Sequence, residues 1–104
     1  MVLLHIDLKD GFQDDTVIIK VNNSEEFRKE HITTDLRIAL ATKFTTNVTS
    51  GEVELQAIIP SKDLADSYKF IASSETYIGI SIMDPGLPNE KIQFSISDEP
   101  FAYL

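Results

Sequence analysis

Alternation of apolar and polar residues recurs along the chain, and it limits the possible folds more than any other feature of the sequence. Val2, Leu4, Ile6 and Leu8 would share one face of an extended segment, with polar residues on the other. Because successive side chains of a strand point to opposite faces, this spacing predicts a strand that buries one side. The same spacing predicts strands with inward rows at Val17, Ile19 and Val21; at Val53, Leu55, Ala57 and Ile59; at Thr76, Ile78, Ile80 and Ile82; and at Ile92, Phe94 and Ile96.

The composition agrees with a strand-rich chain. Ile, Val, Thr, Phe and Tyr supply about a third of the residues, and these types suit a pleated, half-buried surface. A chain of 104 residues is long enough for one core and too short for several domains. The absence of cysteine excludes a disulfide scaffold, and the short apolar runs exclude a membrane span. We therefore expect a single all-β domain over residues 1–104.

Three segments have less certain boundaries. Residues 26–29 are predicted to form a short strand with Phe27 inward, although a cap at Ser24 leaves a helix as the alternative. The even-numbered residues of 32–48 alternate for longer than one strand allows, which predicts a bend or bulge near 39–42. A turn that starts at Ser61 should lead into a strand over 67–72.

Turn residues at intervals of about eight to twelve residues divide the chain into seven or eight short strands. This spacing is typical of an antiparallel β-sandwich. In general architecture the predicted domain resembles immunoglobulin-like and fibronectin-like sandwiches. It lacks the Cys…Trp…Cys spacing of antibody domains, so the resemblance extends only to the fold class.

The charge of the chain limits its partners. Nine Lys and Arg against seventeen Asp and Glu give a net charge of −8, which opposes binding to nucleic acids and anionic membranes. The segment Met1–His5 lacks the basic residues of a secretory leader, which favours a cytoplasmic location. A protein or a carbohydrate is the expected partner.

Acidic residues cluster around one glycine-containing loop. Asp10, Asp14 and Asp15 lie in this loop, and Asp7 precedes it. Calcium takes six to eight oxygen ligands, often from such a loop, so the four carboxylates are candidate calcium ligands. The order of the acidic residues and the glycine is not that of an EF-hand loop. The alternative to a calcium site is an ordinary solvated loop. Phe12 in the same loop is expected to plug the end of the core.

Catalytic patterns are weak. Gly79–Met83 lacks the second glycine of a nucleophile elbow, and His5 and His31 are expected at the surface. Glu52 and Glu54 would share a solvated strand face, although paired carboxylates also serve glycosidases. Three aromatic residues are expected to pack in the core or at a sheet edge, and the alternative is that they form a platform for stacking on a sugar. These residues are Phe27, Tyr68 and Tyr77.

The sequence therefore predicts a non-catalytic β-sandwich that serves in binding or assembly. The alternatives are a calcium-dependent carbohydrate- or protein-binding accessory domain, and a small hydrolase with an Asp/His site.

Two nearly uncharged strands, 78–82 and 92–96, precede an apolar tail at 101–104. This hairpin or tail would provide an isologous homodimer contact, unless the hairpin is internal and the tail folds back over the end of a sheet.

Overall fold

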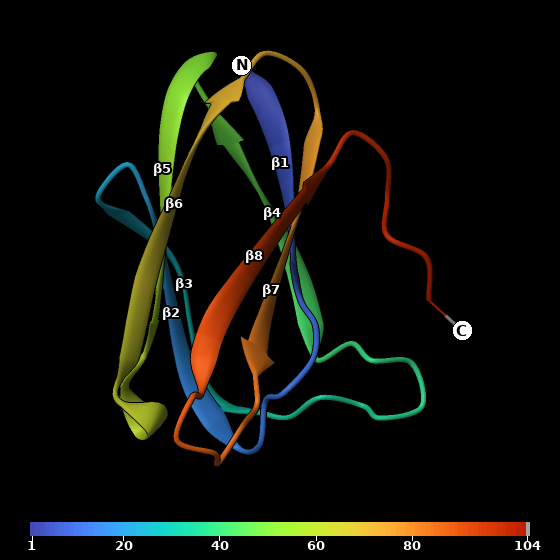
Figure 1. Ribbon diagram of the computed structural model, residues 1–104. Helices are drawn as coiled ribbons and strands as arrows, with labels where there is room; N and C mark the ends of the chain where they lie inside the picture. The colour runs from blue at the N-terminus through green and yellow to red at the C-terminus, as the bar shows by residue number, and fades with distance from the viewer. Residues whose placement is uncertain (104) are drawn as a thin grey trace.

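The computed structural model describes residues 1–103, and in this part of the chain it contains eight β-strands and no α-helix. No helix in these residues is therefore long and apolar enough to cross a membrane. The strands form two four-stranded sheets that pack face to face (Figure 1), which confirms the prediction of an all-β domain. The elements are β1 (Val2–Leu8), β2 (Asp15–Val21), β3 (Ser24–Ile32), β4 (Thr42–Val48), β5 (Gly51–Ile59), the 3-10 helix η1 (Pro60–Lys62), β6 (Leu64–Ala72), β7 (Thr76–Met83) and β8 (Lys91–Ser97).

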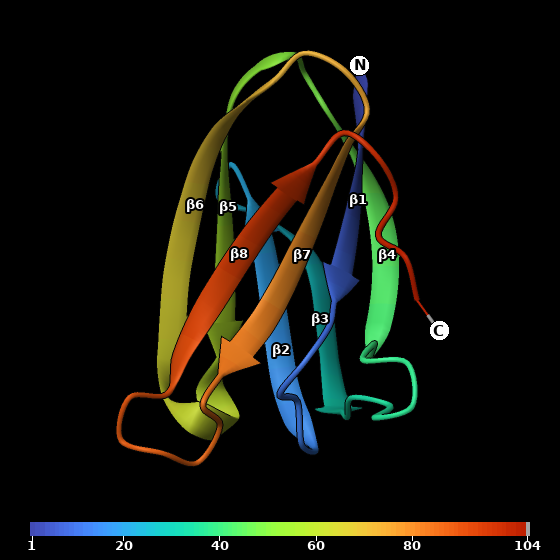
Figure 2. The same ribbon diagram turned by 45° about the vertical axis from the view of Figure 1, so that its right-hand side comes forward.

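The sheets bring together segments that are far apart in the chain. Sheet A has the strand order β4-β1-β7-β8, and sheet B has the order β3-β2-β5-β6. All neighbouring strands are antiparallel except β1 and β7, which run parallel and place His5 beside Tyr77. In Figure 2 the strands of sheet A cross in front of those of sheet B.

The core lies between the sheets and consists mainly of the residues predicted to face inward. The inward rows of β1, β2, β5 and β7 are buried as the alternation predicts. Phe12, in the loop after β1, is only 1% exposed and closes one end of the core. The fully buried large side chains include Leu4, Ile6, Leu8, Phe12, Ile19, Leu55, Ile59, Ile78 and Ile80.

Residues 33–41 require a correction, because the predicted strand before the bend is absent there, whereas the part after the bend is β4. The chain leaves the sheets between β3 and β4, and Leu36 is 89% exposed. Thr34 supplies the physical reason. Its buried hydroxyl donates to the Lys9 carbonyl oxygen at 2.7 Å and accepts the Phe12 N–H at 3.1 Å. These bonds tie the segment to the loop after β1 instead of to a neighbouring strand.

Two other uncertain segments are strands. Residues 26–29 lie within β3, so the strand and not the helix is correct, and Phe27 packs partly against the core. β6 begins at Leu64, earlier than the predicted start at residue 67, because η1 ends within three residues of Pro60. Asp63 follows in the left-handed region with a φ of 54° and reverses the chain.

Stacked aromatic rings close the two open sides of the sandwich. Phe27 of β3 stacks on Phe44 of β4 with ring centroids 4.6 Å apart. On the other side, Tyr68 of β6 stacks on Phe94 of β8 at 5.7 Å. Each pair joins an edge strand of sheet A to an edge strand of sheet B, so these rings fill gaps that backbone hydrogen bonds leave open.

Candidate functional site

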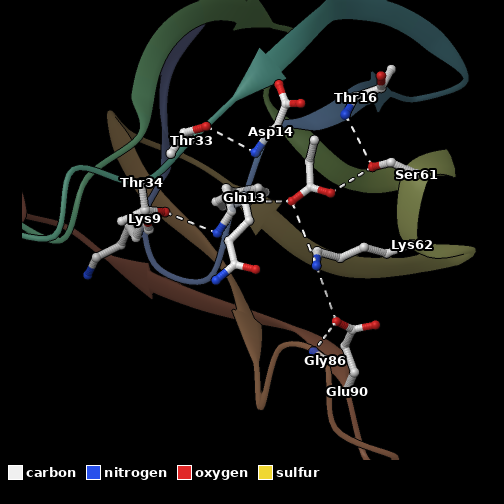
Figure 3. Close-up of polar contacts among 12 residues, drawn as sticks. Lys9, Gln13, Asp14, Thr16, Thr33, Thr34, Ser61, Lys62, Gly86 and Glu90 are labelled. Carbon is white, nitrogen blue, oxygen red and sulfur yellow. Dashed lines mark hydrogen bonds and ion pairs between the residues drawn. The ribbon is translucent and has the colours of Figure 1, made fainter.

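The carboxylates in and around the loop after β1 have different surroundings. Figure 3 shows part of this loop, where the Asp14 N–H donates to the Thr33 hydroxyl. Asp14 is exposed, and its Oδ1 lies 2.7 Å from His31 Nδ1. Asp10 is also exposed, whereas Asp15 is 2% exposed and lies at the start of β2. Asp7 is on the outer face of sheet A, where it accepts a hydrogen bond from Tyr103.

Asp15 is held in a buried polar network that joins three parts of the fold. Its Oδ2 accepts the Gln13 N–H at 2.8 Å, and its Oδ1 accepts the Ser61 hydroxyl at 2.7 Å. Lys62 Nζ lies 3.9 Å from Asp15 and 3.4 Å from Glu90. The network thus links β2 to η1 and to the loop between β7 and β8, so its first role is structural.

Within residues 1–103, no three His, Asp or Glu side chains gather in a group that could hold a metal ion. The calcium site at Asp7, Asp10, Asp14 and Asp15 therefore stays a prediction without geometric support. Melting curves in calcium and in chelator test it, because a ligand of the native state raises the melting temperature.

The exposed pair of Asp14 and His31 has a measurable consequence. The Asp14 carboxylate raises the pKa of His31 through their hydrogen bond. A raised folded pKa stabilises the fold below the unfolded pKa, and this contribution disappears as the pH rises through the folded value. We expect an NMR titration midpoint for His31 above about 6.5. Asp14→Asn should lower it; an unchanged midpoint in that variant would show that the pair does not form.

A second polar cluster stands on the outer face of sheet A. His5 of β1 and Tyr77 of β7 stack with ring centroids 4.2 Å apart, because the parallel register places them side by side. Glu75 Oε2 lies 2.7 Å from His5 Nε2 and accepts the Tyr77 hydroxyl at 2.8 Å. The hydrogen bonds from Tyr77 and His5 lower the pKa of Glu75, and Glu75 raises the pKa of Tyr77.

The end of the described chain folds back across this outer face. The Tyr103 hydroxyl donates to Asp7, and Lys9 Nζ lies 4.2 Å from the centroid of the Phe101 ring. Burial, followed by the hydrogen bond to Asp7, raises the pKa of Tyr103. Gly79 makes room for the Lys9 side chain under the Phe101 ring, since a Cβ there would lie 2.8 Å from Lys9 Cδ. Leu104, the last residue of the predicted tail, lies outside the described residues.

The Tyr103–Asp7 contact predicts a loss of stability in Tyr103→Phe. Asp7 is 5% exposed, so removing its donor leaves a buried carboxylate oxygen without that hydrogen bond. We expect a decrease of about 1 kcal/mol or more in the free energy of unfolding, measured in urea. Tyr77→Phe is the matched control, because it removes a hydroxyl that bonds to an exposed carboxylate. A Tyr103→Phe protein as stable as this control would contradict the assignment.

The aromatic residues predicted as a sugar platform do not share a face. Phe27 and Tyr68 lie on opposite open sides of the sandwich, and Tyr77 is on the outer face of sheet A. Glu54 on β5 pairs with Lys69 of β6 at 3.9 Å. Glu52 lies on the same outward face of β5, opposite Ile71.

Four strands have a free edge, and β3 and β6 carry more charge there than β4 and β8, which have one lysine each. β3 contains Glu25, Glu26, Arg28, Lys29 and Glu30, and its pairing with β2 is irregular at two places. β4 carries Lys43. β6 carries Lys69, and also Asp66 on its core face opposite buried Ala57. Charge, irregular pairing and inward-pointing acids all oppose pairing with another chain.

β8, like β4, carries a single lysine near its start and no charge in the rest of the strand, over residues 92–97. It differs from β4 in its core-face residues. Ile96 lies opposite fully buried Ile78 and belongs to the core face, yet it is 45% exposed. Beside it is an open depression of about 230 Å³, which is lined by Thr76, Ile96, Ser97 and Asp98. β8 thus combines free backbone groups with an uncovered apolar side chain.

Sequence reasoning missed both the His5–Tyr77–Glu75 cluster and the Asp15–Lys62–Glu90 network. The alternation placed His5 on an outer face, but its neighbour depends on the parallel pairing of β1 with β7. No local signal links residues so distant in sequence.

Searches of protein-family models, of curated proteins and of solved structures find no match to this chain.

Proposed function

We propose that the protein is a non-catalytic β-sandwich that works in assembly, by adding a strand of a protein partner to the free edge of β8. The observation that carries this proposal is Ile96. It is a core-face isoleucine, 45% exposed, on an edge strand whose central residues carry no charge. In strand addition, backbone hydrogen bonds supply affinity, and pockets for alternate side chains supply specificity. The open depression beside Ile96 supports the proposal, because it offers space for one side chain of the added strand.

A synthetic peptide with the sequence of residues 91–99 is a direct probe of the edge. Titrated into isotope-labelled protein, it should shift the amide signals of β8 and of Thr76, and leave those of β3 unchanged. Ile96→Lys should abolish the shifts, because it places a charge on the core face of the edge strand.

Ile71→Lys is the matched control. Ile71 is also an exposed isoleucine on an edge strand, but it lies on β6. This variant should bind the peptide like the parent. Peptide binding that survives Ile96→Lys, or no shift in β8 at millimolar peptide, would refute the proposal.

A small hydrolase is the competing proposal, and one observation favours it. Each imidazole has a carboxylate partner, His5 with Glu75 and His31 with Asp14, as the general base of a triad does. A hydrolase of this type should lose turnover in His5→Ala or in His31→Ala. Turnover that remains in both variants would eliminate these sites.

The likeness to immunoglobulin and fibronectin domains is proposed for the general architecture alone. In the immunoglobulin constant type, the first strand pairs with the second. Here β1 pairs with β4 and β7, and β2 pairs with β3 and β5.

A calcium-dependent accessory domain for carbohydrate or protein stays a further proposal, tested by the calcium melting curves described above.

A further inference from the structure

We propose that the strand added to β8 is β8 of a second copy of this chain, running antiparallel, with Ser95 opposite Ser95 of the other copy at a twofold axis. This inference rests on the proposed role of the β8 edge and names its partner.

The charges at the two ends of β8 favour an antiparallel pair. Lys91 begins the strand, and Asp98 and Glu99 follow it directly. An antiparallel partner places each lysine near the acidic end of the other copy, whereas a parallel partner would place like charges together. Within residues 1–103, none of these three side chains forms an ion pair, so each is available to a partner.

The faces of β8 determine the register. Residues directly opposite in an antiparallel pair share one face of the sheet. Lys91 and Ser95 lie on the outer face, opposite Met83 and Gly79 of β7. β8 ends at Ser97 and the chain bends at Asp98 and Glu99, so Glu99 joins this face when pairing with the second copy extends the strand by two residues. Phe94 and Ile96 lie on the core face. With Ser95 at the axis, Lys91 lies opposite Glu99 and Phe94 lies opposite Ile96, each twice by symmetry.

The path of the chain beyond β8 leaves this edge uncovered. Phe101 contacts Lys9, and Tyr103 bonds to Asp7 of β1. β1 lies on the other side of β7 from β8, so the tail crosses the sheet away from the free edge of β8. A second copy can therefore approach β8 without displacing the tail.

A charge swap tests the pairing by sedimentation equilibrium of the full chain. The parent should dimerise in a concentration-dependent manner. Lys91→Glu and Glu99→Lys should each weaken the dimer about tenfold, because each replaces two attractive cross-strand pairs by two like-charge pairs. The double variant should regain the affinity of the parent. Both residues are exposed, so melting temperatures equal to that of the parent, measured at concentrations where all the variants are monomeric, are the control for folding.

Cross-linking tests the register. The chain contains no cysteine, so Ser95→Cys introduces one thiol, and its symmetry mate would lie within reach of a disulfide. This variant should oxidise rapidly to a covalent dimer. Thr45→Cys, at an exposed outer-face position on the edge strand β4, should not.

Two results would overturn the inference: a double variant as weak as either single variant, or a parent that stays monomeric at every concentration. A monomeric parent that still binds the peptide of residues 91–99 would reject the second copy alone and leave the proposed role of the edge intact.

Discussion

Phe12→Ala is expected to lower the free energy of unfolding by about 3–5 kcal/mol, the range for truncating a buried aromatic ring. Phe12 is 1% exposed and is the largest fully buried side chain in the described chain. Its backbone is fixed on both sides, since its N–H bonds to the Thr34 hydroxyl and its carbonyl oxygen accepts the Thr34 N–H. The surrounding structure therefore cannot collapse easily into the space left by the ring.

Chemical denaturation measures this loss, and Phe101→Ala is the matched control. Phe101 is a half-buried ring against Lys9 on the outer face of sheet A, so its removal should cost much less. Equal losses in the two variants would show that Phe12 does not close the core.

Gly11→Ala is expected to cost about 3 kcal/mol, as the sum of backbone strain and a steric clash. Gly11 has a φ of +90°, where an L-residue is strained. A Cβ at this position would also lie 2.2 Å from the Ile82 carbonyl oxygen, so the loop and the end of β7 must separate. That separation would break the bond from the Ile82 N–H to the Asp10 carbonyl oxygen, which is 2.8 Å long.

Gly86→Ala separates the two contributions. Gly86 has a similar φ of +80°, but a Cβ there meets nothing within 4 Å. This control should lose only about 1 kcal/mol, from strain alone. Equal losses in thermal or chemical denaturation would mean that the close approach of Gly11 to β7 does not limit the fold.

Local alternation predicted most strands, because each strand has one face in the core. The rows of β1, β2, β5 and β7 are clear in the sequence for that reason. The same rule failed at 33–41, where Thr34 bonds to the loop after β1 and the apolar residue Leu36 points to solvent. A long-range hydrogen bond of this kind has no periodic signal.

The order of the strands was beyond local reasoning, and the candidate site depends on that order. The sequence indicated that 92–96 is nearly uncharged, and it offered the hairpin of 78–82 and 92–96, or the tail, as a contact between copies. It did not show that β8 is an edge strand. For the same reason it placed Ile96 in an inward row with Ile92, although Ile96 is 45% exposed and Ile92 only 6%.

The acidic residues around the loop after β1 show that the sequence does not predict the partner of each carboxylate. The sequence places Asp7, Asp10, Asp14 and Asp15 close together in one segment. In the fold, however, Asp7 bonds to Tyr103 and Asp14 bonds to His31. Asp15 bonds to Ser61 and forms an ion pair with Lys62. The partner of each carboxylate therefore depends on the fold, and calcium binding by these residues stays a prediction.

Residue-resolved amide hydrogen exchange over a range of protein concentrations tests the role of β8 most directly. The four edge strands are compared in one experiment, so β3, β4 and β6 serve as internal controls. The amides of β8 that face away from β7 should become more protected as concentration rises, and those of the other three edges should not. Protection of β8 that does not change with concentration, or a gain on β4 instead, would contradict the assignment of β8 as the assembly edge.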